Sequence, residues 1–238
     1  MYCIDATTYY LSSMIIAVLP VVILLYYFWY RDRGEKEPMK LMRKVFIWGI
    51  LVIAPIIVIE MLLEDFALSF ISDPIVFLLV SNFLLVALPE ELAKFTVVKK
   101  AAYNHHKFNE VMDGITYAIL ASMGFAIAEN VLYTINYGIE IGYLRSITAV
   151  PAHALFSGIM GYYIGQAKFT QDKKKKKALF LKGICAAIFF HGLYNFMLST
   201  EIAFVQLSVF LLIFYMFTVL NRAIKLAHKD KMSPLRYI

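Results

Sequence analysis

The sequence predicts an all-α integral membrane protein, a polytopic bundle of about seven transmembrane helices. The first observation is composition: 61% of the 238 residues are hydrophobic and 17% are charged. Soluble globular domains contain about 45–50% apolar and about 25% charged residues. The second observation is a series of apolar runs, each long enough to cross a hydrocarbon core of roughly 30 Å as a helix. A soluble fold of this length could not bury so many such runs.

The apolar runs give the expected spans, bounded by charged or turn-forming residues. They are residues 13–30, 45–63, 75–98, 111–136, 146–167, 179–199 and 203–221. The first run lacks a basic segment before it and a small-x-small cleavage site after it, so it is expected to be a retained helix and not a signal peptide.

The loop charges predict an orientation. Lysines and arginines gather in alternate connections, including the run from Lys173 to Lys177, and in the C-terminal tail. The other connections hold Asp5, Glu64, Asp65, Asp73, Glu140 and Glu201, with Arg145 as their only cation. Basic loops stay in the cytoplasm, so an odd number of spans with the N-terminus outside and the C-terminus inside fits. The formal charge of +6 therefore indicates topology and a lipid bilayer, with no nucleic-acid partner.

Ionisable residues within a span are costly and are functional candidates by default. The third expected span contains Glu90, Glu91 and Lys94. Two adjacent carboxylates repel each other, and Lys94 lies within reach of both on the helix surface, at i+4 and i+3. An ion pair that only makes insertion tolerable accounts for one glutamate and the lysine, and leaves the second glutamate for a function.

The next three spans each contribute polar candidates. Glu129 shares its face with small residues at i−4 steps, including Ser122, Ala118 and Gly114, so it is expected to face another helix. His153 is followed at i+4 steps by Ser157, Gly161 and Gly165. His191 and Asn195 lie one turn apart in the sixth span. Glu129 has no basic residue before it on its face, so its partner is expected from another helix.

This set of residues supports a limited chemistry. A glutamate can act as general base on water, a histidine can move protons or polarise a carbonyl, and an asparagine can donate to an oxyanion. Alternatively, Glu90, Glu91, Glu129, His153 and His191 could ligate a divalent metal such as zinc that activates the water. There is no His-Glu-x-x-His motif, no pattern for a Ser–His dyad and no paired intramembrane aspartates.

The same residues carry a resemblance that extends over nearly the whole chain. It begins with Arg31-Asp32-Arg33 and Glu37-Pro38, followed by Glu90-Glu91-x-x-Lys94 and Asp113-Gly114-Ile115. It continues with Gly124-Phe125-Ala126-x-x-Glu129-Asn130, His153, Gly161-Tyr162-Tyr163-x-Gly165 and His191-Gly192-Leu193-Tyr194-Asn195. In this order the motifs resemble the PrsW family of bacterial intramembrane proteases, which is distantly similar to the CAAX prenyl-endopeptidase group.

The resemblance implies a single transmembrane protease domain over residues 1–238 in the bacterial cell membrane. Its substrate would be a single-span membrane protein, an anti-sigma factor, and its site-1 cut would start the regulated proteolysis that releases a stress sigma factor. Glu90, Glu91, Glu129, His153, His191 and Asn195 are the expected catalytic residues, with Lys94 as a supporting ion-pair partner. One element departs from the CAAX pattern, in which a histidine follows phenylalanine by four residues. Here Phe125 is followed by Glu129, and His153 is the candidate for the missing imidazole.

Two questions stay open at the level of sequence. A non-catalytic membrane scaffold or a proton-coupled transporter would use the same buried glutamates and histidines. In addition, at 1.5 Å per residue, Glu129, His153 and His191 lie about 11–12 Å below the outer ends of their expected spans, whereas Glu90 lies about 24 Å below. A kink at Pro89 or a tilt of the helix would have to bring the glutamate pair to the level of the histidines.

Overall fold

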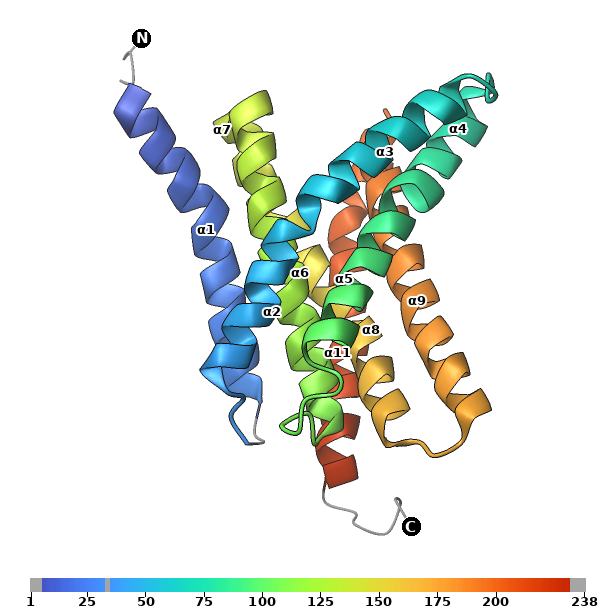
Figure 1. Cartoon of the computed structure of the whole chain (residues 1–238). Coiled ribbons are helices and arrows are strands. Elements are labelled where there is room, and N and C mark those ends of the chain that lie inside the picture. Colours follow the sequence, from blue (N-terminus) through green and yellow to red (C-terminus); the bar gives the residue numbers. More distant parts are fainter. Residues whose placement is uncertain (1–5, 33–34, 232–238) are drawn as a thin grey trace.

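The computed structural model describes residues 6–32 and 35–231, and these fold as helices joined by short connections (Figure 1). Asp5 and Arg33, which entered the sequence analysis, lie outside the described residues. The elements are α1 (Ala6–Arg31), α2 (Met39–Leu51), α3 (Ile53–Leu68), α4 (Pro74–Val80), η1 (Ser81–Ala87), α5 (Leu88–Ala101), α6 (Val111–Tyr137), α7 (Ile139–Ile147), α8 (Ala149–Phe169), α9 (Lys173–Ser199), α10 (Ala203–Leu207) and α11 (Val209–Lys231).

The described residues contain seven segments that are long and apolar enough to cross a membrane, which confirms the predicted number. They are Met14–Arg31, Met39–Leu68, Pro74–Ala101, Val111–Tyr137, Ile139–Phe169, Lys173–Ser199 and Ala203–Lys229. The connections after the first, third and fifth segments lie at the same end of the bundle as the C-terminal end of α11 (Figure 1). We call this the basic end. Which side of the membrane it faces stays a prediction.

Three expected loops are wrong, because the helices continue past the charged residues. Glu64 and Asp65 belong to α3, which ends at Leu68, and Glu140 and Arg145 belong to α7. The run from Lys173 to Lys177 opens α9. The second and fifth spans are therefore longer than 45–63 and 146–167, and each is broken once, at Val52 and at Thr148. Hydropathy ends a span at a charged side chain, but a helix continues where that side chain finds water or a partner.

Helices α6 and α8 form the centre of the bundle. In the span formed by α6, 83% of the most apolar stretch is buried within the protein, and in the span that contains α8 the share is 78%. The same share is 17–28% in the other five spans. Their small residues meet: a Cβ added at Gly161 would lie 2.3 Å from the carbonyl oxygen of Gly114, and one at Gly165 would lie 2.3 Å from that of Val111. The small-residue faces predicted on these two helices therefore pack against each other.

At the basic end, acidic residues hold the connection between α1 and α2 onto α6. The Tyr117 hydroxyl donates to Glu37, and the Thr116 hydroxyl donates to Asp32. Asp113 accepts from two backbone N–H groups just before α6 and so caps its first turn. Burial raises the pKa of Glu37. The sequence motifs at Asp32, Glu37 and Asp113 thus fasten the fold together and lie apart from the glutamates and histidines inside the bundle.

Candidate active site

The glutamate pair sits where the third span changes its winding. Helix α4 passes into the π-helical segment η1, and Pro89 opens the first turn of α5, which carries Glu90 and Glu91. π-Helical segments are rare in proteins as a whole, and those that occur often lie at functional sites. Here the turn places both carboxyl groups in the interior, with the Glu91 side chain fully buried and that of Glu90 4% exposed.

Lys94 neutralises the pair from one turn further along α5. Its Nζ lies 2.8 Å from Glu90 Oε2 and 2.8 Å from Glu91 Oε1, and its side chain is fully buried. The ammonium also lies 4.3 Å from the centre of the Phe125 ring, a favourable position for a cation. The predicted contact of the lysine with both glutamates is therefore observed.

The two adjacent glutamates differ in how fully they are bonded. Glu91 Oε1 accepts from Lys94 and lies 3.0 Å from His191 Nδ1, while its Oε2 accepts from the Ser157 hydroxyl at 3.3 Å. Glu90 uses Oε2 for Lys94, and its Oε1 has no hydrogen-bond partner among the described residues. Glu91 is thus fixed from three sides, whereas Glu90 keeps one oxygen for a ligand or a water.

His153 lies between Lys94 and Glu129. Its Nδ1 is 3.1 Å from Lys94 Nζ, and its Nε2 is 2.9 Å from Glu129 Oε2. An ammonium can only donate, so Nδ1 accepts and the ring proton sits on Nε2, which donates to the carboxylate. Two partners thus fix both the tautomer and the orientation of the ring.

The sequence predicts a partner for Glu129 from another helix without identifying it, and the structure shows that this partner is Arg145 on α7. Its guanidinium lies 2.8 Å from Glu129 Oε1 and 3.8 Å from the centre of the Tyr133 ring, and the two charged side chains are 17% and 16% exposed. Both oxygens of Glu129 are therefore occupied, one by Arg145 and one by His153. The assignment of Arg145 to an outer loop was wrong because this ion pair draws it into α7, against α6.

His191 presents a free nitrogen. Its Nδ1 faces Glu91 Oε1, which can only accept, so Nδ1 carries the proton and the Nε2 of the neutral ring carries a lone pair. That Nε2 has no hydrogen-bond partner in the part of the chain described. The ring stacks on Phe156, with centroids 4.6 Å apart and planes 7° apart, and lies 5.2 Å from the His153 ring.

Asn195 follows His191 by one turn on α9 and is half-buried. Its side-chain amide makes no hydrogen bond to a residue that the structure describes. It is thus available to a substrate, which agrees with its expected place on the same side of the helix as His191.

The depth difference between Glu90 and His153 nearly disappears for two reasons. The fifth span begins at Ile139 and not at residue 146, so His153 lies about 21 Å along its span at 1.5 Å per residue. The stretch before Glu90 leans across the bundle as α4 and η1 (Figure 1), and a π-helix rises less per residue than an α-helix because each turn holds more residues.

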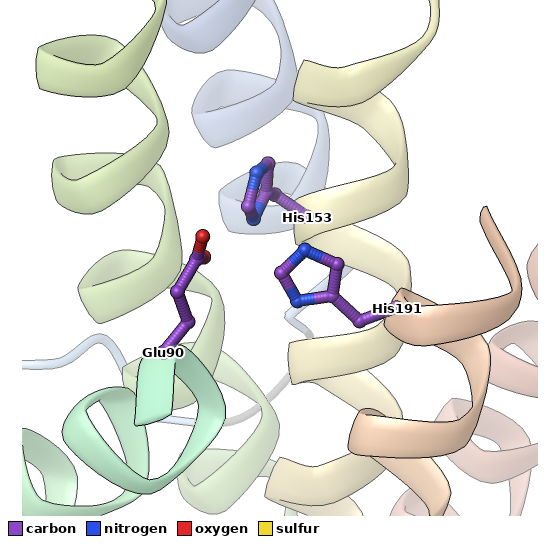
Figure 2. A group of neighbouring side chains, drawn as sticks. All are labelled: Glu90, His153 and His191. Atoms are coloured by element: carbon purple, nitrogen blue, oxygen red, sulfur yellow. The ribbon is translucent and has the colours of Figure 1, made fainter. Parts of the chain in front are cut away.

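Glu90, His153 and His191 point toward one another from α5, α8 and α9 (Figure 2). One ligand atom from each lies within 4.8 Å of the other two, and all three residues are buried. This donor set fits a divalent metal such as zinc, since two imidazoles and one carboxylate are a known catalytic zinc set. The free Glu90 Oε1 and the lone pair on His191 Nε2 agree with that fit. His153 would have to release Lys94 from its Nδ1 to bind the metal, because that nitrogen carries the one lone pair of the ring.

Sequence reasoning missed two members of this network. Arg145 was counted with the loops, although a lone cation among acidic outer loops was itself a signal. Ser157 was read as a packing residue, but its hydroxyl also bonds to Glu91. Single-sequence patterns give no indication of that contact, because it depends on how α5 and α8 approach each other.

Comparisons with known proteins identify the family. A family model described as "PrsW family intramembrane metalloprotease" matches residues 37–221. The chain is 38% identical over 190 residues to "Protease PrsW" of Geobacillus kaustophilus, covering 80% of this chain and 81% of the relative. It is 39% identical over 189 residues to that of Oceanobacillus iheyensis (79% and 84%) and 34% identical over 189 residues to that of Bacillus subtilis (76% and 80%). No solved structure matches the chain.

The buried Glu90, His153 and His191 group lies inside a bundle of seven candidate spans. The family match covers the segments that carry all three residues. The chain is a multi-pass membrane protein, and it belongs to the PrsW family of intramembrane metalloproteases.

Proposed function

We propose that Glu90, His153 and His191 are the hydrolytic centre and that the reaction is the site-1 cut in a membrane-spanning anti-sigma factor. The observation that carries the proposal is the set of unsatisfied atoms. Glu90 Oε1 and His191 Nε2 have no hydrogen-bond partner among the described residues, whereas Glu91 of the same site is bonded through both of its oxygens, Lys94 through its ammonium and His153 through both ring nitrogens. Free polar atoms deep in a membrane protein are costly unless they bind something.

Glu90 is the general base in this proposal. Its Oε2 is held by Lys94, and its Oε1 is left to take a proton from the attacking water and pass it to the leaving amine. Metal-dependent hydrolysis is the alternative for the same three side chains: a divalent ion held by Glu90, His153 and His191 would supply the Lewis acid that activates the water, and Glu90 would then be a ligand in place of the general base. Glu91, Lys94, Glu129 and Arg145 hold these three side chains in position.

Oxyanion stabilisation falls to Asn195. The sequence suggested that His191 and Asn195 share this role, but a neutral His191 with its proton on Nδ1 offers an acceptor at Nε2 and not a donor. The amide of Asn195 is an N–H donor at any pH, and it lies one turn away on the same helix.

An anti-sigma factor with a single span fits as substrate because the site lies inside the membrane bundle and because of the family resemblance. The test uses the purified full chain in detergent and the single-span anti-sigma factors encoded in the same genome. We expect one cut in the anti-sigma factor, located by mass spectrometry at or near its outer membrane boundary. Loss of the cut with chelator and its return with zinc would assign a metal to the centre. Failure to cut any anti-sigma factor, while another single-span protein is cut, would overturn the substrate assignment.

A further inference from the structure

Glu60 is an ionisable residue on α3 that the hydrolytic centre does not use. The face of α3 that turns toward the bundle carries the buried residues Ile53, Ile56 and Ala67, and Glu60 lies on that same face, half-buried. Helix α3 packs against α5, η1 and α6, which flank the site. Ionisable residues within a membrane span are functional candidates. Glu60 and Glu90 both lie within expected spans, so Glu60 is a candidate as well.

The Glu60 carboxyl lacks a partner that it needs. Its Oε1 is buried and has no hydrogen-bond partner among the described residues. The charged groups that act on it most strongly include Glu90 and Glu129, with Lys94 after them. No ion pair compensates it in the described part of the chain. A buried carboxyl without a partner is destabilising, which favours a function that supplies the missing hydrogen bond.

Three other acceptor side chains around the site are already engaged. Glu91 accepts from three groups, Glu129 is held by Arg145 and His153, and His153 Nδ1 accepts from Lys94. Glu90 and His191 have free atoms, but these belong to the proposed hydrolytic centre of Glu90, His153 and His191. Glu60 is not part of that centre. Glu60 therefore lies on a helix packed against α5 and η1, which carry and precede Glu90, and it still has acceptor capacity.

A substrate brings donors that need such an acceptor. A transmembrane helix must unwind locally before its peptide bond can be attacked, and its freed backbone N–H groups then have no water to bond to in the hydrocarbon region. We propose that Glu60 binds the substrate by accepting a hydrogen bond from a backbone N–H of the unwound segment beside the scissile bond. This inference rests on the proposed proteolytic function of the site.

The test compares steady-state cleavage by purified full-chain variants, with fluorogenic peptides built on the membrane span of an anti-sigma factor of the same genome. Glu60→Met keeps the length of the side chain and removes the acceptor, whereas Glu60→Gln keeps a carbonyl acceptor. Glu64, one turn further on and exposed, gives the matched control Glu64→Met. We expect Glu60→Met to raise KM by about 2–10-fold, the range for losing a hydrogen bond between neutral groups, with kcat unchanged. Glu60→Gln should keep the KM of wild type.

A structural role would give a different result. Because Glu60→Met removes an unpartnered buried carboxyl, its thermal unfolding midpoint in detergent should equal or exceed that of wild type. A lower midpoint, a loss of kcat at unchanged KM, or a KM equal to that of Glu64→Met overturns the inference. Glu90→Gln is measured alongside: if it is inactive while Glu60→Met matches the control, the inference fails and the proposed function stands. If Glu90→Gln cleaves like wild type, or if wild type cuts none of the peptides, the proposed function fails and the inference with it.

Discussion

At the scale of single residues, the site shows how two neighbouring glutamates acquire different roles. The contact of Lys94 with both of them follows from i+3 and i+4 spacing and could be predicted. The division of roles could not, because it depends on Ser157 and His191, which reach Glu91 from two other helices. In the proposed mechanism, the full bonding of Glu91 makes it a positioning residue, and the partial bonding of Glu90 leaves it for the reaction.

The pair of Arg145 and Glu129 gives a prediction at this scale. Either Arg145→Met or Glu129→Gln leaves the other charged group without its partner, so each single variant should lower thermal stability. The double variant should be less destabilised than the sum of the two, with a coupling of about 1–3 kcal/mol, as for contacting groups in one network. Unfolding of the four proteins in detergent measures this double-mutant cycle. Simple additivity would mean that the ion pair does not stabilise the fold.

At the scale of secondary-structure elements, the sequence predicted faces but not their partners. Small residues at i±4 steps mark one side of α6 and one side of α8, and the structure shows that these sides face each other. The break at Val52 and the π-helical segment η1 were not predicted. Hydropathy measures the polarity of a segment and is insensitive to a change from i→i+4 to i→i+5 hydrogen bonds; Pro89 alone hinted at an irregularity.

The contact between α6 and α8 predicts a strong effect at Gly161. A Cβ there would meet the Gly114 carbonyl oxygen at 2.3 Å and the Ala118 Cβ at 2.7 Å. Backbone atoms cannot move aside as a side chain can, so Gly161→Leu must separate the helices and should cost at least about 1–3 kcal/mol, the range for overpacking.

The control for Gly161→Leu is Ala54→Leu on the exposed side of α3, which should leave the unfolding midpoint near that of wild type. Equal midpoints for the two variants would contradict the close packing of the central helices. A separation of α6 and α8 should also move Glu129 away from His153, so Gly161→Leu is expected to lose cleavage activity together with stability.

At the scale of the whole molecule, composition and loop charge were enough to predict an all-helical membrane protein with seven spans. They were not enough to place the ends of the spans, as the long second and fifth spans show. Span number depends on summed hydropathy, which averages over many residues. The end of a span depends on where individual charged side chains contact water or an ion-pair partner. Arg145 pairs with Glu129 within the bundle, so the fifth span extends past it.

The predicted orientation can be tested by cysteine accessibility. In a variant with both native cysteines replaced by serine, Glu201→Cys should react with a membrane-impermeant maleimide in intact cells. Lys175→Cys should react only after permeabilisation, because Lys175 lies in the first turn of α9 at the basic end, and basic segments between spans stay in the cytoplasm. Labelling of Lys175→Cys from outside would reverse the topology.

The central claim is that Glu90 takes part in peptide hydrolysis at this buried site. The most direct measurement is cleavage of a single-span anti-sigma factor by purified Glu90→Gln under single-turnover conditions, beside Glu64→Gln as a matched control on an exposed glutamate. Loss of a general base lowers the rate by about 100–10,000-fold. The account predicts a loss of at least that size for Glu90→Gln, with an unchanged unfolding midpoint, and a wild-type rate for Glu64→Gln. Cleavage by a folded Glu90→Gln protein at the wild-type rate would contradict it.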